Sequence, residues 1–189
     1  EDMDNAERTE IKSNPVTYAM KIKKHIEKLA EKRTEDVFSK WIDTDKVFLK
    51  YEYLLPKHIT PTFSKDSITK SLYVSEQDMN TFESEIITQI VSLENVVFWH
   101  KIIERKGFFI NGFINHYPDF LIHTKSGKVI LLETKGDHLD GSDSVRKLKL
   151  GRIWANKAGT NYRYFMVFKE NSIKDAYLVE EFMNVIKEL

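Results

Sequence analysis

The sequence predicts an α/β fold with an N-terminal helical extension. Apolar residues recur at helical spacing through the highly charged first third of the chain. From residue 75 onward, helical stripes alternate with short runs of β-branched and aromatic residues that are typical of strands. A length of 189 residues suits one domain with an appended segment. We place the extension at residues 1–70 and the α/β domain at residues 71–189.

The composition is that of an ordinary globular protein. Hydrophobic residues make up 41% of the chain and charged residues 31%. No apolar run is long enough to span a bilayer and the N-terminus lacks signal-peptide features, so we expect a cytoplasmic protein with no membrane partner. The absence of cysteine excludes disulfides, thiolate nucleophiles and cysteine-type zinc sites. Because position 1 is not Met, we expect the chain to be a piece of a longer protein.

The first third of the chain is expected to be helical from about Pro15 to Leu55. Two apolar stripes at helical spacing support this expectation. They contain Tyr18, Ile22, Ile26 and Leu29, and then Val37, Phe38, Trp41 and Ile42. We interpret both as faces of amphipathic helices that pack onto the rest of the chain. The stretch from Pro56 to Ser75 is rich in turn-forming residues, so the boundary is expected there.

The next helix is expected from Ser75 to about Leu93. Ser75 and Asp78 match a capping box, and the apolar residues that follow share one stripe. These residues are Met79, Phe82, Ile86, Ile90 and Leu93. At 100° per residue, Glu83 falls inside the apolar arc whereas Glu85 falls outside it. A carboxylate in a buried stripe is costly unless it is paired, so Glu83 is either functional or an edge residue that reaches solvent or caps a neighbour.

Short apolar runs predict strands in the middle of the chain, at residues 96–99, 108–110, 120–122 and 129–132. The last two flank residues 124–128, a polar connection with a glycine that predicts a hairpin loop. A further helix is expected from Ser142 to about Lys157, with Gly151 allowing close packing on the sheet. An aromatic strand over residues 162–168 follows. The closing helix carries Leu178, Phe182, Val185 and Leu189 on one face.

The candidate chemistry lies on the two strands of the predicted hairpin. Antiparallel pairing brings Asp119, at the start of one strand, close to Glu133, at the end of the other. Alternation along the strand puts Lys135 on the same face as Glu133. Two carboxylates beside an ammonium group suit Mg²⁺-assisted phosphodiester hydrolysis, and the carbonyl of Thr134 is a further candidate ligand. A structural ion pair between Glu133 and Lys135 is the alternative.

These motifs resemble those of the PD-(D/E)xK nuclease superfamily. The specific elements are Pro118-Asp119 and Glu133-Thr134-Lys135, set between predicted strands and helices. More narrowly, residues 72–168, about half of the chain, resemble the nuclease domain at the C-terminal end of the restriction subunit of type III restriction enzymes. The segments that carry this narrower resemblance are residues 79–83, 95–100, 117–120, 132–137 and 147–155.

The resemblance implies a restriction-endonuclease-like core, in which helices flank a mixed central sheet. It implies a Mg²⁺-dependent DNA endonuclease, with Mn²⁺ as a substitute, that leaves a 5′-phosphate. Asp119 and Glu133 would be metal ligands, Lys135 the catalytic lysine, and Glu83 a carboxylate that joins the metal shell through water. The implied partners are double-stranded DNA, a helicase motor region, a modification subunit and a second copy of the chain on DNA. No phosphate-binding Gly-x-x-x-x-Gly-Lys-Ser/Thr segment occurs, so no ATP site is expected in this chain.

The predicted helix after the motif is basic. Its cationic residues are Arg146, Lys147, Lys149 and Arg152. We expect them to contact DNA phosphates, with an ordinary solvated helix face as the alternative. The chain as a whole balances 29 basic against 29 acidic residues. This balance favours a catalytic domain that other domains deliver to DNA over a free-standing DNA-binding module.

Other polar residues flank the motif. His116 and His138 are close enough in sequence to contact substrate, although their spacing matches no zinc motif. Asp137, Asp140 and Asp143 could recruit a second metal, or could simply solvate a loop. Two rival functions remain open from the sequence. One is a stand-alone junction resolvase or repair nuclease, and the other is a catalytically silent DNA-binding or subunit-docking module.

Overall fold

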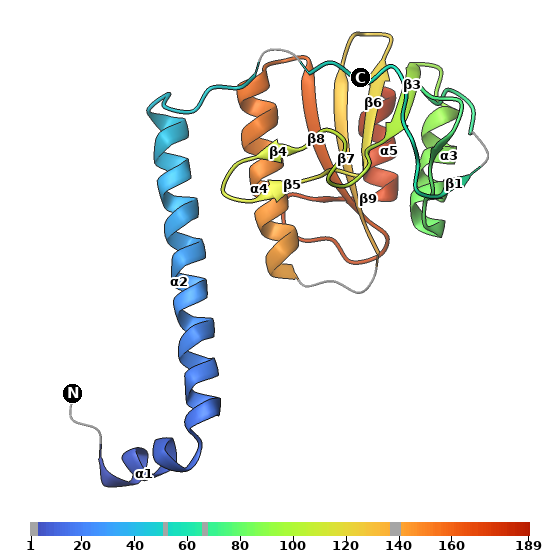
Figure 1. The fold of residues 1–189 in the computed structure, drawn as a ribbon. Helices are drawn as coiled ribbons and strands as arrows, with labels where there is room; N and C mark the ends of the chain where they lie inside the picture. The colour runs from blue at the N-terminus through green and yellow to red at the C-terminus, as the bar shows by residue number, and fades with distance from the viewer. Residues whose placement is uncertain (1–3, 51–52, 66–67, 137–140) are drawn as a thin grey trace. The chain divides into compact units, whose positions relative to one another are not determined.

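The computed structural model describes residues 4–50, 53–65, 68–136 and 141–189. The chain divides into two compact units, Glu1–Phe48 and Leu49–Leu189. The first unit is helical and the second is mixed α/β (Figure 1). Among the described residues, no helix combines the length and the apolar character that crossing a membrane requires.

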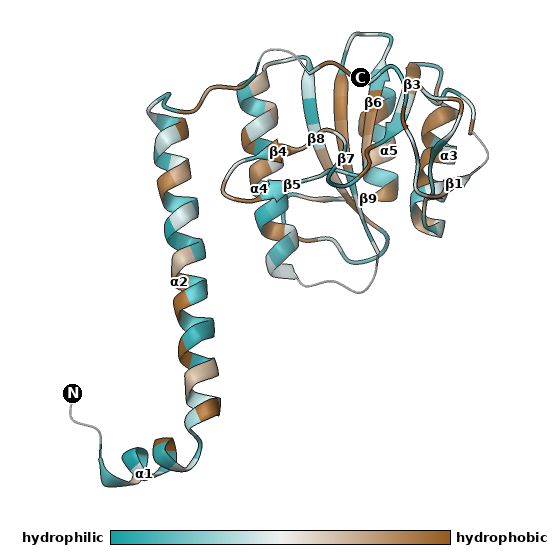
Figure 2. Ribbon diagram, viewed as in Figure 1, coloured by the Kyte–Doolittle hydropathy of each residue, from teal (hydrophilic) through white to brown (hydrophobic). Residues whose placement is uncertain are grey.

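The N-terminal unit contains α1 (Asn5–Ser13) and α2 (Pro15–Asp43). Pro15 stands in the first turn of α2, where its missing N–H would have no helical partner in any case. The helix carries both predicted apolar stripes, which appear as brown segments along it in Figure 2. The expectation that helix continues to Leu55 is wrong. Asp45 takes a left-handed φ of 50° just after the helix, which ends it at Asp43.

The α/β unit is built on a five-stranded mixed sheet with the order β3-β6-β7-β8-β9. The strands are β3 (Val96–Lys101), β6 (Phe120–Thr124), β7 (Val129–Lys135), β8 (Tyr162–Phe168) and β9 (Tyr177–Leu178). The neighbours β3, β6 and β7 are antiparallel, whereas β8 and β9 run parallel to β7. The predicted hairpin between β6 and β7 is confirmed, and Gly127 supplies the left-handed φ of 80° that its turn needs.

Helices cover both faces of the sheet (Figure 1). Helices α3 (Thr81–Val91) and α5 (Val179–Lys187) lie on one face and α4 (Gly141–Ala158) on the other. The core between the sheet and α3 and α5 includes Ile130 and Leu132 of β7, a strand that is largely brown in Figure 2. Because side chains alternate along a strand, Glu133 points to the face that α4 covers.

Two short hairpins complete the α/β unit. They pair β1 (Ser64–Lys65) with β2 (Glu76–Gln77), and β4 (Ile110–Asn111) with β5 (Asn115–His116). Strand β1 lies in the turn-rich stretch where the sequence placed the boundary, and β2 directly follows that stretch. Leu72 N–H donates to the Trp99 carbonyl of β3, which ties this stretch to the sheet. The compact α/β unit, which begins at Leu49, includes this stretch.

Two predicted elements begin elsewhere in the structure. Helix α3 begins after Asn80, whose side chain caps it, and not at Ser75. The reason is that Glu76, directly after Ser75, is paired in the extended strand β2 and cannot also be helical. Of the strand expected at residues 108–110, only Ile110 is in β4. The Phe108 ring instead packs edge-on against Tyr53.

Candidate active site

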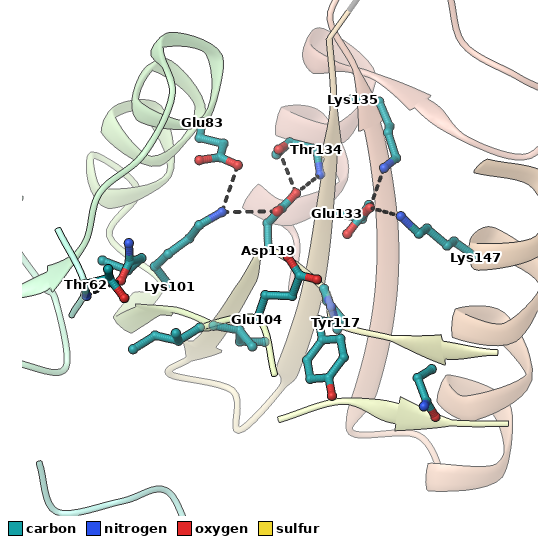
Figure 3. A pocket seen from close by; sticks show the side chains of 15 residues that line it. Thr62, Glu83, Lys101, Glu104, Tyr117, Asp119, Glu133, Thr134, Lys135 and Lys147 are labelled. Carbon is teal, nitrogen blue, oxygen red and sulfur yellow. Dashed lines mark hydrogen bonds and ion pairs between the residues drawn. The ribbon is translucent and has the colours of Figure 1, made fainter. Parts of the chain in front are cut away.

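A cavity of about 600 Å³ opens where β6 begins and β7 ends. Residues of α3 and α4 also line it, so both faces of the sheet contribute (Figure 3). The lining includes four carboxylates and three lysines, namely Glu83, Glu104, Asp119, Glu133, Lys101, Lys135 and Lys147. Phe120 of β6 pairs with Leu132 of β7, which sets Asp119 and Glu133 opposite each other one step beyond. The structure thus brings the two carboxylates of the predicted motif into one cavity.

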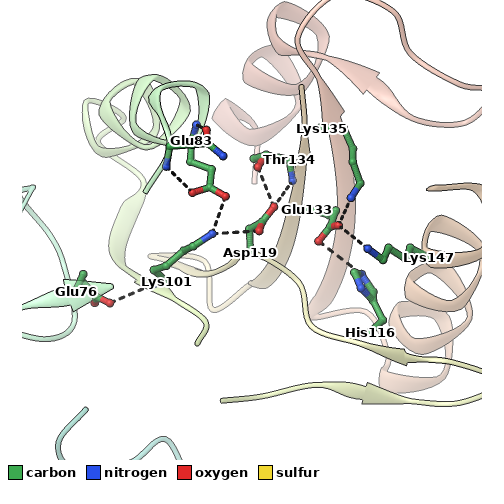
Figure 4. A network of polar contacts seen from close by, with 10 residues as sticks. Glu76, Glu83, Lys101, His116, Asp119, Glu133, Thr134, Lys135 and Lys147 are labelled. Carbon is green, nitrogen blue, oxygen red and sulfur yellow. Dashed lines mark hydrogen bonds and ion pairs between the residues drawn. The ribbon is translucent and has the colours of Figure 1, made fainter. Parts of the chain in front are cut away.

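On the α3 side of the cavity, Lys101 bridges two carboxylates (Figure 4). Its Nζ lies 2.8 Å from Glu83 Oε1 and 3.1 Å from Asp119 Oδ1. Burial raises the pKa of Glu83, and the charge of Lys101 offsets this only in part. Burial alone would lower the pKa of Lys101, but Asp119 and Glu83 outweigh it and hold that pKa above its usual value. Lys101 is therefore a buried ammonium ion.

Thr134 holds Asp119 in place. Its backbone N–H and its hydroxyl both donate to Asp119 Oδ2, at 2.7 and 2.8 Å. Burial raises the pKa of Asp119, but Lys101 and the two Thr134 hydrogen bonds more than compensate, so the pKa lies below its usual value. The sequence suggested the Thr134 carbonyl as a metal ligand, whereas the structure shows Thr134 orienting the carboxylate through its N–H and its side chain.

On the α4 side of the cavity, Glu133 has only one paired oxygen. Its side chain is 5% exposed, and Oε1 lies 2.5 Å from Lys135 Nζ and 3.7 Å from Lys147 Nζ. Oε2 is buried and has no hydrogen-bond partner. Burial and the nearby charge of Asp119 raise the pKa of Glu133 to about 7, despite the opposing effect of Lys135. The predicted contact between Glu133 and Lys135 is present, but it leaves half of the carboxylate unsatisfied.

His116 and Tyr164 form the wall behind Glu133. His116 is fully buried, with Nε2 2.8 Å from Tyr164 Oη and 3.9 Å from Glu133 Oε2. Burial, with help from Lys147 and Lys135, lowers the pKa of His116 to about 3, so the ring is neutral near pH 7. A Cβ on Gly151 would lie 2.4 Å from the Tyr164 ring, so glycine lets α4 approach the sheet as the sequence predicted.

The predicted basic group lies entirely in the described part of α4. Lys147 is the one member of this group that lines the cavity. Its Nζ lies 2.9 Å from Asp143, one turn earlier on the helix. Asp143 belongs to the acidic run that the sequence singled out. The other acidic residues of that run, Asp137 and Asp140, lie outside the described residues, as does His138.

The remaining basic residues of α4 are away from the cavity. Arg146 and Lys149 lie over the Phe113 ring, at 5.9 and 6.0 Å from its centroid. Arg152 lies 3.2 Å from Asp175 at the surface. The four cations therefore do not form one group: Lys147 lines the cavity, and the other three lie outside it.

Sequence reasoning missed Lys101. The available signal was its position two residues after Trp99 in a predicted strand, which places both on the same face. Trp99 is fully buried, so a lysine on that face requires a buried partner. The predicted inward-facing carboxylate of Glu83 is that partner.

The residues of the cavity fit Mg²⁺ better than a metal that needs a full set of protein ligands. No group of three or more His, Asp or Glu side chains is placed to hold a metal ion in the part of the chain that the structure describes. Mg²⁺ needs no such group, because it keeps several waters and takes one or two carboxylates. Asp119 Oδ1 and the unpaired Glu133 Oε2 are oxygen donors of that kind.

No protein-family model, no curated protein and no solved structure matches this chain. The resemblance to PD-(D/E)xK nucleases therefore depends on Asp119, Glu133, Lys135 and the elements around them. What the structure shows of the fold is a mixed α/β unit with a five-stranded mixed sheet.

Proposed function

We propose that the α/β unit is a Mg²⁺-dependent nuclease with a restriction-endonuclease-like core, and that it hydrolyses phosphodiester bonds in DNA. The observation that carries this proposal is the unpaired, buried Oε2 of Glu133 beside Asp119 and Lys135. A buried carboxylate oxygen without a partner destabilises the free protein. A bound cation would remove that penalty, and oxygen donors favour a hard cation such as Mg²⁺, with Mn²⁺ as a substitute.

Each side chain of the cavity has a role in this proposal. Asp119 and Glu133 would hold the metal, and Thr134 orients Asp119 for it. Bound Mg²⁺ supplies an acidified water and positive charge for the phosphate oxygens. Lys135 orients the attacking water or neutralises the charge that develops on phosphate. Neutral His116 fills the space behind Glu133.

DNA would approach along α4. Lys147 reaches into the cavity, where it can contact the phosphate under attack. Arg146 and Lys149, outside the cavity, can contact neighbouring phosphates, which positions the duplex without reading its sequence. The balance of 29 basic and 29 acidic residues fits delivery by a motor region and a modification subunit, as in type III restriction enzymes. A second copy of the chain would cut the other strand.

A plasmid-nicking assay tests the proposal. Incubation with supercoiled plasmid and Mg²⁺ should yield open circles, and EDTA should abolish the reaction. Glu133→Gln and Lys135→Ala should each slow nicking by about 10²–10³-fold, because the first weakens the hold on the metal and the second removes a positive charge from the transition state. Glu94→Gln and Lys187→Ala change exposed residues that do not line the cavity, and should nick at the parental rate.

Other results of this assay would replace the proposal. Equal nicking by the parent and both cavity variants would show that the cavity is not the source of the activity. DNA binding without cleavage by any form would identify a DNA-binding or docking module. A strong preference for branched over linear DNA would identify a junction resolvase or repair nuclease.

A further inference from the structure

Lys101 provides a positive charge inside the cavity that the proposed catalytic groups do not use. Its side chain is 10% exposed, and those of Glu83 and Asp119, its partners, are 11% and 22% exposed. The ammonium group lies between the two carboxylates (Figure 4), at 2.8 Å from one and 3.1 Å from the other. This is the position that a cation shared by Glu83 and Asp119 would take.

Each oxygen of Glu83 already has a donor in this arrangement. Its Oε1 accepts from Lys101, and its Oε2 accepts from the backbone N–H of Asn80 at 3.0 Å, in the capping box of α3. Asp119 differs, because Oδ2 takes both Thr134 donors while Oδ1 takes Lys101 alone. An ionised carboxylate oxygen has two lone pairs, and Asp119 lies opposite Glu133 across the β6–β7 hairpin, so Oδ1 is the oxygen that a metal at Glu133 can share.

The surroundings of Lys101 hold it in this position. Its backbone pairs with Phe120 in the β3–β6 ladder, and its Nζ lies 4.7 Å from the centroid of the Phe120 ring. Its backbone N–H donates to buried Glu76 at 3.2 Å. Withdrawal of the ammonium group would leave Glu83 and Asp119 facing each other without compensation, so Lys101 is a fixed part of the cavity.

We propose that Lys101 acts as a built-in cation that occupies the position between Glu83 and Asp119, and so restricts the site to a single divalent metal on the Glu133 side. Glu83 then serves Lys101 and the helix cap, in place of the water-mediated metal contact that the resemblance implies. Asp119 takes part both in the ion pair with Lys101 and in the proposed metal site beside Glu133. This inference rests on the proposed function for the metal at Glu133, but its test measures metal binding rather than cleavage.

The test is to count metal ions per chain by titrating the whole protein with Mn²⁺ and following the free ion by electron paramagnetic resonance. The parent should bind one ion. Lys101→Met keeps the length of the side chain and removes its charge, and should bind two ions, because the vacated position now has two carboxylates for an oxygen-seeking cation. Adding Glu83→Gln to Lys101→Met should return the count to one. Glu83→Gln alone should bind one ion with unchanged affinity.

The opposite results overturn the inference. The inference fails if the parent binds two ions or if Lys101→Met binds no more ions than the parent. It also fails if Glu83→Gln alone weakens Mn²⁺ binding by about tenfold or more, which is the effect expected when a group of the metal shell is lost. Should Lys101→Met be unfolded in EDTA, recovery of its circular dichroism on adding Mn²⁺ supports the inference. If Lys101→Met stays unfolded with Mn²⁺, the Mn²⁺ affinity of Glu83→Gln decides whether the inference holds.

Failure of the proposed function gives a different pattern. A parent that binds no Mn²⁺ and cleaves no DNA would refute the nuclease proposal. The gain of one bound ion on Lys101→Met, and its loss on adding Glu83→Gln, would still identify Lys101 as a built-in cation.

Discussion

The two sides of the cavity are built from the same kinds of residue but differ in how fully they are paired. On the α3 side, Glu83 and Asp119 share Lys101, and each of their four oxygens has a donor. On the α4 side, Glu133 has two lysines near one oxygen and none at the other, which is buried and without a partner. The α3 side is fully paired in the free protein, whereas the α4 side leaves one carboxylate oxygen unpaired.

This difference separates stability from function. A buried carboxylate whose oxygens are all paired contributes to a well-defined structure, and removing its partner is costly. A buried carboxylate with an unpaired oxygen weakens the free protein and gains from any cation that binds there. Loss of Lys101 on the α3 side should therefore destabilise the protein, whereas replacing the Glu133 carboxylate on the α4 side should stabilise it while removing the proposed activity.

The largest change in stability is expected for Lys101→Met in EDTA. It leaves Glu83 and Asp119 buried without their shared cation, and should lower the free energy of unfolding by about 3 kcal/mol or more. Urea unfolding followed by circular dichroism measures this. Lys106→Met, at an exposed position, should change stability by less than about 0.5 kcal/mol. Equal stability of the two variants would show that the α3 side is not held by Lys101.

Glu133→Gln should raise the free energy of unfolding, in contrast to Lys101→Met, and should do so only above acid pH. The pKa of Glu133 is about 7 in the folded protein against 4.5 as the reference value. A raised pKa means that this group's stabilising contribution is full below pH 4.5 and is lost as the pH rises to about 7. Gln resembles the protonated form at every pH, so in EDTA the variant should be more stable than the parent by about 2–3 kcal/mol at pH 8.

The control for this prediction is the same measurement at low pH. At pH 4 the parent and Glu133→Gln should unfold at the same urea concentration, because Glu133 is then protonated in both states. Saturating Mg²⁺ at pH 8 should stabilise the parent and leave the variant unchanged. A variant less stable than the parent at pH 8 in EDTA would mean that Oε2 is satisfied after all.

Tyr164→Phe should cause a smaller loss on the α4 side. It removes the hydroxyl that lies 2.8 Å from His116 Nε2 and leaves that buried nitrogen without a partner. The expected loss of stability is about 1–2 kcal/mol, measured by urea unfolding. Tyr162→Phe serves as the comparison, because it removes a hydroxyl from a half-buried ring in the same strand. The same loss in both variants would exclude a specific role for the bond to His116.

The smallest effect is expected for Lys149→Ala, which lies outside the cavity on α4. It should weaken DNA binding and reduce the slope of log affinity against log salt concentration by about 1, with no change in the cleavage rate on saturating DNA. Lys147→Ala, inside the cavity, should lower that rate as well. Equal behaviour of the two variants would remove the distinction between lysines inside and outside the cavity.

Much of the fold around the site could be predicted from local patterns. The aromatic run of β8 matched its predicted bounds, and the β6–β7 hairpin followed from two apolar runs and a loop containing Gly127. The start of α3 was misplaced because Ser75 and Asn80 are both good capping residues, and only the pairing of β2 excludes Ser75. The end of α2 was misplaced because apolar residues continue after Asp43 without a helix.

The sequence by itself determined that Glu133 lies beside Lys135 and that Asp119 shares their cavity, because both depend only on alternation along β7 and one short hairpin loop. Helical periodicity, a local property, also placed Glu83 inside the apolar arc, but it left open whether the carboxylate is buried or reaches solvent; the structure buries it. Only the tertiary structure decided that Lys101, 18 residues from both Glu83 and Asp119, completes one carboxylate pair while Glu133 stays half paired. Such pairing depends on how α3, β3 and β6 pack together, and ion pairs between distant segments leave no periodic trace in the chain.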